Sequence, residues 1–332
     1  MNLQLLFSLY PFIWQSIVSF LFTLLITIGL MKVFSIKNAA LCSLLFMTPI
    51  LVPLILPFRG QIGLIRWGCM LASADNFLHN LSSFHQALTL VCLLPPLLAL
   101  ARGFISYVSY KVLLRKTRVT NAEQEPLLFS ILHELTQKAK IPLPRVFLLP
   151  VGSVNIFTCG TFRPVLAISP MLLTELPEDE LEAVLAHEVA HLVRRDQIVS
   201  WIVSLLSTLM FYNPFLYPLL KKIGHEREKA ADAFAVAMTH KPRVLANGLL
   251  RVIKLASESK IEIKLLNAPI LKLTSGDALY ERVTALLSEK KQIDNAYKYS
   301  WRIVVLFLCI SLILNIAMLL PMFRPSFCIM MS

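Results

Sequence analysis

Long apolar runs without a formal charge limit what this chain can fold into more than any other feature. Three of them, Leu3–Met31, Asn38–Phe58 and Leu81–Ala101, precede the central region, and a fourth, Ile303–Phe323, lies between Arg302 and Arg324. About 20 apolar residues are enough to cross a bilayer as a helix. The mean hydropathy of +0.67 is also above that of typical soluble domains. The sequence therefore predicts four transmembrane helices, and not the buried helices of a large soluble core.

The first apolar run is predicted to be a retained anchor. It lacks a basic segment in front of it and is longer than the apolar part of a secretory signal peptide. The six cysteines are scattered and form no CxxC pair. Neither a disulfide framework nor a thiolate zinc site is therefore expected.

The distribution of basic residues predicts the orientation in the membrane. Of the 32 Lys and Arg residues, 25 lie between Ile105 and Trp301. By the positive-inside rule this region is cytoplasmic, Lys32 and Lys37 lie in a short cytoplasmic loop, and both termini lie outside a bacterial-type inner (plasma) membrane. Residues 59–80 then form an outer loop, although Arg59 and Arg66 run against the rule.

The net charge of +12 is interpreted in the same way. Basic cytoplasmic segments of membrane proteins lie close to anionic lipid, so the expected partner is the lipid bilayer. No combination of basic and aromatic residues suggests a nucleic-acid platform, and direct nucleic-acid binding is not expected.

The central region has the pattern of an α+β domain. An amphipathic helix is predicted from Pro126, and the short runs "PRVFLLP", "VNIFTCG" and "PVLAIS" are typical of strands. Helical patterns follow at Glu178–Arg195, Val244–Ser257 and Ala278–Glu289. We therefore expect three parts: a membrane region with three transmembrane helices over residues 1–104, a cytosolic domain over 105–300, and a C-terminal transmembrane helix with a short tail over 301–332.

The stretch "AHEVAH" carries the clearest chemical signal. His187 and His191 are four residues apart on a predicted helix, so their rings project from one face and can occupy adjacent positions around one metal ion. Glu188 lies beside the first histidine, where it can reach a water on the metal without being a ligand. This is the HExxH arrangement of zinc peptidases. The alternative is that the two histidines line a helix face without metal.

A third ligand is predicted in "HEREKAADAFAV". A catalytic zinc ion takes three protein ligands and keeps one open position. Glu228, on a helix expected to begin near Gly224, is the preferred third ligand, and Glu226 is the competing candidate. Asp232 lies one turn after Glu228, where it can fix the tautomer of a ligand histidine from outside the metal's own ligand set. The alternative for Glu228 and Asp232 is an exposed acidic pair. His225 and His240 are equally compatible with surface positions and with a role in the transition state.

The apolar run Ile198–Lys222 is predicted to be a membrane-associated helical hairpin. If His187, His191 and Glu228 meet at one metal ion, both ends of this run lie on the same side of the membrane. About 25 residues cannot make two full spans, and Asn213 with Pro214 is a turn signal. We therefore expect a re-entrant or interfacial hairpin and a metal site close to the inner membrane surface. Asp196, at the junction of helix and hairpin, is expected to support a ligand or to cap a helix.

Three segments in order, "LEAVLAHEVAHLVRRD", "FYNPFLYPLLKK" and "EREKAADAFAV", resemble the BlaR/MecR family of integral membrane zinc metallopeptidases. "GTFRPVLAISPMLL" and "ERVTALL" are similar to the flanking sequence of that family. The resemblance implies three membrane helices, a cytosolic gluzincin (zincin-like) domain and a fourth helix. It also implies one catalytic Zn²⁺ held by His187, His191 and Glu228, with Glu188 as the base and Asp232 in support.

Two features of the chain depart from the pattern of this family. Ala231 stands where family members often have Cys, and the chain ends at Ser332 without the extracellular penicillin-binding domain of the β-lactam sensors. Direct β-lactam sensing is therefore not expected, although a membrane sensor partner would fit. "NIFTCG" followed by the zinc motif also resembles the HtpX and CAAX-processing membrane peptidases.

The predicted activity is zinc-dependent endoproteolysis of a cytosolic or membrane-proximal protein, with a transcriptional repressor in a signalling pathway as one candidate substrate. The alternatives are quality control or processing of membrane proteins by an HtpX/CAAX-type peptidase, and a non-catalytic, zinc-stabilised membrane signalling scaffold. Retention of Glu188 with only three ligands argues against a purely structural site. "PVLAIS" is expected to be the edge strand that pairs with an extended substrate.

Overall fold

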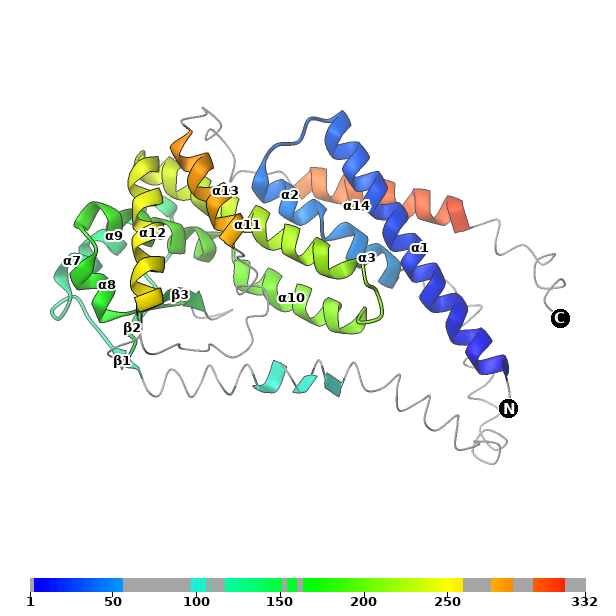
Figure 1. Cartoon of the computed structure of the whole chain (residues 1–332), viewed down its shortest axis with the longest axis horizontal. Coiled ribbons are helices and arrows are strands. Elements are labelled where there is room, and N and C mark those ends of the chain that lie inside the picture. Colours follow the sequence, from blue (N-terminus) through cyan, green and yellow to red (C-terminus); the bar gives the residue numbers. More distant parts are fainter. Residues whose placement is uncertain are drawn as a thin grey trace.

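The structure is a computed structural model of the 332-residue chain. It describes residues 3–55, scattered residues between 97 and 108, and residues 117–150, 154–159, 164–258, 276–288 and 301–319. The predicted outer loop 59–80 and most of the third apolar run, Leu81–Ala101, lie outside the described residues. The described part is mostly helical with one small sheet, and Figure 1 shows a domain containing the sheet at one end and a group of long helices at the other.

A mixed sheet of four short strands forms the β part of the domain. The strands are β1 (Arg118–Val119), β2 (Arg145–Leu148), β3 (Ile156–Cys159) and β4 (Val165–Ile168), in the order β1-β2-β4-β3. β2 and β4 are parallel, whereas β1 and β3 pair antiparallel with β2 and β4 respectively. The three strands predicted from the sequence are thus present as β2, β3 and β4.

The predicted edge position of "PVLAIS" is wrong. This segment is β4, and it pairs with β2 on one side and β3 on the other, with Ala167 facing both Phe147 and Phe157. All four β4 residues are buried, as expected of a strand covered on both faces. Among the described residues, β1 and β3 are the two strands that pair on one side only.

Helices cover the sheet and form the core of the domain. They are α7 (Pro126–Ala139), α8 (Pro170–Glu175), α9 (Glu178–Val193), α12 (Pro242–Glu258) and α13 (Gly276–Leu287). Pro126 and Pro170 stand at the starts of their helices, where a missing N–H costs nothing. Leu132 of α7, Leu185 of α9 and Ile168 of β4 belong to one buried cluster. α9 therefore lies in the middle of the domain, with neighbours on several sides.

A close contact joins α12 to α9. A Cβ atom at Gly248 would lie 2.9 Å from Cγ2 of Val184 and 3.3 Å from the carbonyl oxygen of Glu180. Glycine at this position allows the two helices to approach closely, and the approach fixes the face of α9 that carries the histidines.

The predicted hairpin is present as two antiparallel helices. α10 (Asp196–Leu209) and α11 (Leu216–Thr239) are joined by a turn in which the side chain of Asn213 accepts from the N–H of Phe215 at 3.0 Å. The helix expected to begin near Gly224 begins at Leu216 instead and continues through Gly224. Because a single glycine costs a helix only about 1 kcal/mol, the packed neighbours on either side can maintain it.

The hairpin packs against the apolar helices from the two ends of the chain. These are α1 (Leu3–Val33), α2 (Ala39–Leu45), α3 (Thr48–Ile55) and α14 (Trp301–Leu319). Phe20 of α1 and Ile50 of α3 share a buried cluster with Val203 of α10 and Leu219 of α11. At the tip of the hairpin, the hydroxyl of Ser16 donates to that of Tyr212 at 2.9 Å. The hairpin therefore extends along α1 to Ser16.

Among the described residues, one helix segment, Ser16–Val33, is long and apolar enough to cross a membrane. The second predicted run is divided between α2 and α3, because Pro49 near the start of α3 removes an N–H and interrupts the helix. The apolar stretches of α2–α3, α10 and α14 are shorter, between 10 and 17 residues. Four full transmembrane helices are therefore not established.

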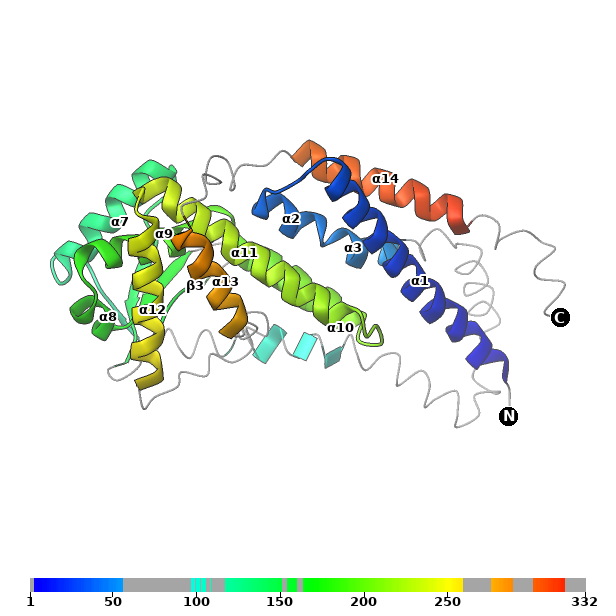
Figure 2. The same cartoon turned by 45° about the horizontal axis from the view of Figure 1, so that its top comes forward.

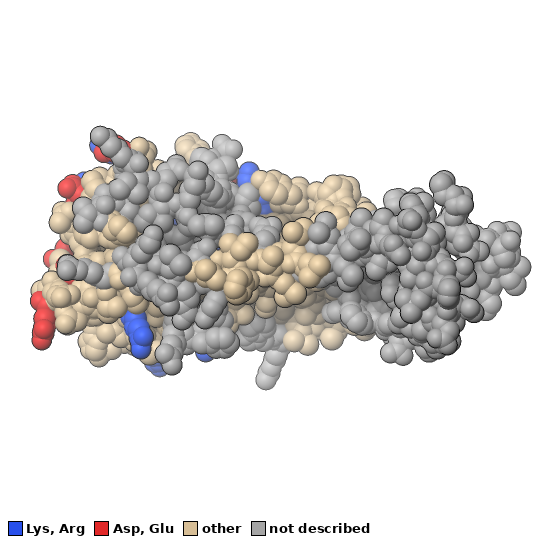
Figure 3. All heavy atoms as spheres, turned by 90° about the horizontal axis from the view of Figure 1, so that it is seen from below, with Lys and Arg blue, Asp and Glu red and all other residues tan. Residues whose placement is uncertain are grey.

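The surface divides along the long axis. In the tilted view of Figure 2, α1, α3, α14 and the hairpin lie on the side away from the sheet, toward the end where α1 begins and α14 ends. In Figure 3 most of the visible charged side chains gather at the opposite end, over the domain that contains the sheet, and the described surface beyond it is largely uncharged. Such a division is expected of a protein with one part in a bilayer and one in water.

Candidate metal centre

The two histidines lie on the buried face of α9. Pro177 precedes the helix, and Glu178, Asp179 and Glu180 occupy its first turn, where carboxylates favour the positive end of the helix dipole. His187 and His191 lie one turn apart, and their Nε2 atoms are 3.2 Å from each other. The ring planes are almost perpendicular, at 86°. Both Nε2 atoms thus face the same point.

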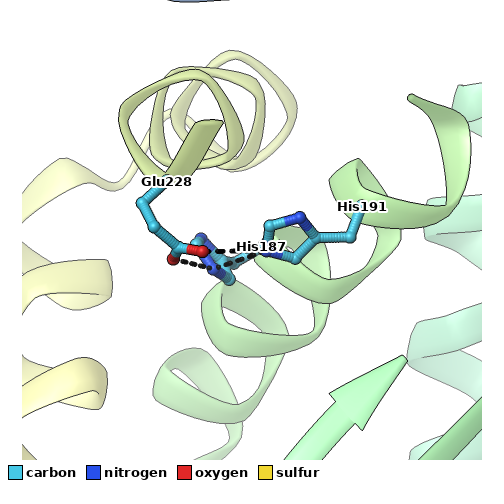
Figure 4. A group of neighbouring side chains, drawn as sticks. All are labelled: His187, His191 and Glu228. Atoms are coloured by element: carbon cyan, nitrogen blue, oxygen red, sulfur yellow. Dashed lines mark hydrogen bonds and ion pairs between the residues drawn. The ribbon is translucent and has the colours of Figure 1, made fainter. Parts of the chain in front are cut away.

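Glu228 reaches that point from α11. Its Oε2 atom lies 3.5 Å from Nε2 of His187, and its Oε1 atom lies 3.8 Å from Nε2 of His191. Figure 4 shows the carboxylate extending from α11 toward the two rings on α9. These three residues form a group whose ligand atoms lie within 4.8 Å of one another.

The spacing of the three groups fits a tetrahedral metal ion. Zinc binds histidine nitrogen and carboxylate oxygen at about 2.0–2.2 Å, so two ligands at the corners of a tetrahedron are about 3.3–3.6 Å apart. The separations of 3.2, 3.5 and 3.8 Å are close to this value. Little movement is therefore needed for all three to bind one ion.

Asp232 stands behind His187. It lies one turn after Glu228 on α11, and its Oδ1 atom is 3.0 Å from Nδ1 of His187, off the direction of a straight hydrogen bond. Burial lowers the pKa of His187, but the carboxylates of Asp232 and Glu228 outweigh it and raise that pKa to about 10. Without a metal ion, a proton on His187 therefore offsets part of the negative charge.

Asp196 stands behind His191 in the same way. Arg195, between α9 and α10, has a left-handed backbone with φ of 51°, and the resulting corner turns Asp196 back toward the preceding helix. Its Oδ2 atom is 2.7 Å from Nδ1 of His191. A carboxylate that accepts a hydrogen bond from Nδ1 keeps the ring proton on that atom. The lone pair of Nε2 is then free, and it is directed at Glu228 and His187.

Arg282 is a member of the site that sequence reasoning missed. It lies on α13, it is buried, and its guanidinium donates to both carboxylate oxygens of Asp232 at 2.7 Å. A third nitrogen lies 3.0 Å from Oε2 of Glu228. Burial raises the pKa of Asp232, but Arg282 and His187 lower it to about 2 overall. A single side chain thus contacts both Glu228 and Asp232.

Arg227 is the second missed residue, and it supports Asp196. Its side chain donates to the backbone carbonyl of Asp196 at 2.8 Å and to the hydroxyl of Ser200 at 2.9 Å. Its Nε atom lies 3.7 Å from the Asp196 carboxylate. Burial raises the pKa of Asp196, whereas His191 and Arg227 lower it, so that the group is anionic. Arg227 therefore joins α11 to the start of α10 directly behind the metal centre.

The charges around the group leave room for a divalent cation. Glu188, Glu228 and Asp232 are buried or nearly so, and Arg282 is the basic side chain that contacts this set. Three carboxylates and one guanidinium sum to two negative charges when the histidines are neutral. A dication would balance them, and buried charge without compensation is costly. Spacing and charge therefore agree on an ion such as Zn²⁺.

Glu188 is not one of the three grouped ligand residues. It is buried, and burial raises the pKa of its carboxyl group, although His191 and His187 act in the opposite direction. Cys159, at the end of β3, lies close enough to feel this charge: burial, with a contribution from Glu188, raises the pKa of its thiol to about 12. β3, an edge strand, also contacts α9, the helix that carries Glu188.

The other candidate residues lie elsewhere. Glu226 is buried and pairs with Lys222 at 3.0 Å, apart from the metal group. Nε2 of His225 lies 2.8 Å from Glu281 on α13, so that His225 is not at the surface. His240 ends α11 with a left-handed backbone. Neither histidine is part of the metal group.

Comparison with known proteins identifies similar sequences over most of the described domain. The model of the family described as BlaR1 peptidase M56 matches residues 77–286. A protein named "Protease HtpX homolog" from Trichormus variabilis is 29% identical over 238 residues, which cover 56% of this chain and 82% of that protein. One of the same name from Pelotomaculum thermopropionicum is 35% identical over 105 residues, covering 30% of this chain and 37% of that protein.

One solved structure is also similar. The crystal structure of S. mikatae Ste24p aligns with a TM-score of 0.41 and 19% sequence identity, covering 70% of this chain and 64% of that one. This chain thus spans slightly less than two thirds of the Ste24p chain.

Proposed function

The chain belongs to the BlaR1 peptidase M56 family and is a zinc metallopeptidase, and we propose that it is a membrane-embedded endopeptidase that cleaves cytosolic or membrane-proximal protein segments. One observation carries the assignment of the site: the ligand atoms of His187, His191 and Glu228 lie together at tetrahedral spacing. One catalytic Zn²⁺ is the proposed cofactor.

In this proposal the zinc ion and the residues around it have separate chemical roles. Zinc in such a site supplies Lewis acidity toward the scissile carbonyl and lowers the pKa of water to about 7. Glu188 takes the proton of the attacking water and passes it to the leaving amine. Its raised pKa suits this exchange, since a base that must also donate works best with a pKa near the working pH. Asp232 and Asp196 hold the ligand histidines in one tautomer.

The open edge of β3 is the proposed binding surface for the substrate backbone. β3 pairs on one side with β4, and its last residue, Cys159, lies near Glu188. An extended segment added to this edge would form main-chain hydrogen bonds and pass the metal centre. This role replaces the one expected for "PVLAIS", which is enclosed between two strands.

The hairpin supports a site at the membrane surface. Its exposed apolar side chains, Trp201, Leu205, Phe211 and Tyr217 among them, would face water in a soluble protein. Lys221 and Lys222 follow on α11 and are exposed. Glu228 is six residues beyond Lys222, about 9 Å along the helix axis. We propose a re-entrant hairpin, with the metal centre just inside the cytoplasmic surface and both termini outside.

The proposed division of the chain follows from this arrangement. Residues 1–104 and 301–332 are the membrane parts, and 105–300 the peptidase domain that includes the hairpin. The shared cluster of Phe20, Val203 and Leu219 means that hairpin and membrane region pack as one unit.

Two substrate classes are proposed. The first is regulatory cleavage, with a repressor as substrate and a sensor as partner. The second is cleavage of membrane proteins in quality control. The family model described as BlaR1 peptidase M56 and the relatives named as HtpX proteases support peptidase activity in general. The position of the metal centre near the bilayer suits both, since each requires a segment that reaches the inner surface.

The test compares wild type with Glu188→Gln, using Glu178→Gln as a matched control in the exposed first turn of the same helix. We expect Glu188→Gln to keep stoichiometric zinc, to lose peptidase activity by a factor of about 100 to 10,000, and to accumulate uncleaved proteins in cells. The identity of those proteins separates regulatory from quality-control cleavage. Absence of zinc from both proteins, or unchanged cleavage by Glu188→Gln, would contradict the proposal.

A further inference from the structure

A pocket separate from the metal centre lies where α1 meets α2. Its volume is about 400 Å³. The residues around it are of two kinds: apolar, including Ile28, Ile36 and Phe46, and polar, namely Lys32, Ser35 and Lys37. Such a combination suits an amphiphilic ligand better than a purely polar one.

The end of α1 shapes this pocket. Ser35 has a left-handed backbone with φ of 48°. Its N–H donates to the carbonyl of Lys32 at 3.1 Å, and the N–H of Ile36 donates to the carbonyl of Met31 at 2.9 Å. This is the Schellman motif, which ends a helix and reverses the chain. The reversal places Lys37 beside the same pocket as Lys32.

The two lysines present uncompensated positive charge there. Both are exposed, and within the part of the chain that the structure describes neither has a carboxylate partner within 4.0 Å. Lys32 lies in the last turn of α1, at the end of the candidate span Ser16–Val33. The charge therefore lies at the boundary between apolar and polar surroundings, at the depth of lipid headgroups.

An apolar strip continues from the pocket along α1. Leu25 and Ile28 lie one turn apart on this helix, and their side chains are 70% and 37% exposed. This strip lies on the side of the pocket away from the basic residues. A ligand with an anionic head and a hydrocarbon chain would satisfy both surfaces at once.

We propose that the α1–α2 junction binds an anionic phospholipid. The phosphate lies between Lys32 and Lys37, and an acyl chain lies along Ile28 and Leu25. The site depends on the proposed membrane location of α1 and not on the catalytic assignment. It borders α2, whose Ala39 and Ala40 pack against Ala230 of α11, two residues after Glu228. The lipid would thus stabilise α2, the short helix that packs against the metal-ligand helix α11.

The test uses native mass spectrometry of the full-length protein in detergent, with phosphatidylglycerol or phosphatidylcholine added at defined concentrations. Wild type is expected to retain phosphatidylglycerol in preference to phosphatidylcholine. Lys32→Gln/Lys37→Gln should weaken retention about 30-fold, because each basic residue near an anionic surface contributes several-fold to binding. Lys32→Arg/Lys37→Arg should bind as wild type does. Lys138→Gln/Lys254→Gln, which removes the same charge from the peptidase domain, should also bind normally.

Equal retention of the two lipids by wild type would overturn the proposal, as would normal phosphatidylglycerol binding by the double Gln variant. Displacement of phosphatidylglycerol by inorganic phosphate at equal concentration would show a small-anion site and overturn the lipid assignment. If the double Gln variant fails to fold, the wild-type lipid preference and the double Arg variant still decide. The Glu188→Gln protein should bind the lipid as wild type does, so failure of the catalytic proposal would be seen separately.

Discussion

Arg282 offers the sharpest test of how charge is balanced in this site. Its guanidinium contacts both oxygens of Asp232 and one oxygen of Glu228, and the side chain is almost fully buried. Arg282→Met would leave Glu188, Glu228 and Asp232 with the proton on His187 as their main compensation in the metal-free protein. Breaking a buried ion pair from one side costs about 3–5 kcal/mol, which changes the unfolding equilibrium more than 100-fold.

The matched control is Arg251→Met. Arg251 also forms a two-pronged contact with one carboxylate, to Glu180 at 2.6 and 3.2 Å, but its side chain is 47% exposed. Surface pairs contribute little, so this variant should unfold almost as wild type does. Both variants can be measured by protease susceptibility of the metal-free protein in detergent across a urea series.

Zinc should increase the stability difference between Arg282→Met and wild type, because a variant that binds zinc more weakly gains less stability from the same zinc concentration. Arg282→Lys keeps the charge but not the planar fork, and should fall between the two. We also expect Arg282→Met to bind zinc 10 to 100 times more weakly, as is usual when a residue that orients ligands is lost. If Arg282→Met and Arg251→Met lose equally little stability, the charge argument is wrong.

Three further predictions concern single groups. Asp196→Asn should lower zinc affinity 10- to 100-fold without unfolding the domain, because His191 loses its fixed tautomer; a chelator competition assay showing wild-type affinity would contradict this. The pKa of metal-free His187 is about 10. Zinc uptake at pH 7 should therefore release about one proton, and zinc affinity should rise about tenfold per pH unit toward pH 10. Titration calorimetry in buffers of different ionisation enthalpy should measure the number of protons released, and Asp232→Asn should lower that number. Asn315→Leu removes hydrogen bonds of 2.7 and 2.8 Å to α1. The free energy needed to open α14 should fall by about 1 kcal/mol, which would be measured as faster hydrogen exchange in α14. The substitution Ile313→Leu, at an exposed position, should leave that exchange unchanged.

The same His187 proton affects the stability of the metal-free protein. Its folded pKa lies above the unfolded value of 6.5, so its contribution to stability is complete below pH 6.5 and is lost as the pH rises toward 10. Asp232 behaves in the opposite sense. Its folded pKa of about 2 lies below the unfolded 3.8, so its contribution holds above pH 3.8 and is lost as the pH falls toward 2.

The zinc ligands could be proposed from the sequence because their chemistry is local. His187 and His191 need only one helix to face the same point, and Asp232 needs only to follow Glu228 by one turn. The sequence could not show how α9 and α11 meet, since that depends on packing between residues far apart in the chain, such as the buried cluster that contains Leu185 of α9 and Phe234 of α11. The structure therefore adds the relative placement of α9 and α11, which hydrophobic periodicity alone could not show.

The missed arginines did leave a signal. Arg282 lies in the apolar stripe of α13, with Leu279 and Val283 on the same side and the buried Leu286 one turn later. A charged residue inside such a stripe is rarely buried without a partner. Such a position predicts a buried ion pair, but only the fold identifies the partner as Asp232. The error over "PVLAIS" is of the same kind, because four consecutive apolar residues indicate a strand covered on both faces.

The unbroken helix α11 has the largest consequence for function. A helix that began near Gly224 would attach Glu228 to the hairpin through a flexible joint, whereas the observed helix runs without interruption from Leu216. Leu219 shares a buried cluster with Phe20 of α1 and Ile50 of α3, and Glu228 is nine residues further on, about 14 Å along the axis. Glu228, the third ligand, is therefore carried by one continuous helix, and the other end of that helix lies in the cluster with α1 and α3. We therefore predict that a change in how α1 or α3 packs in this cluster shifts Glu228 relative to the histidines on α9.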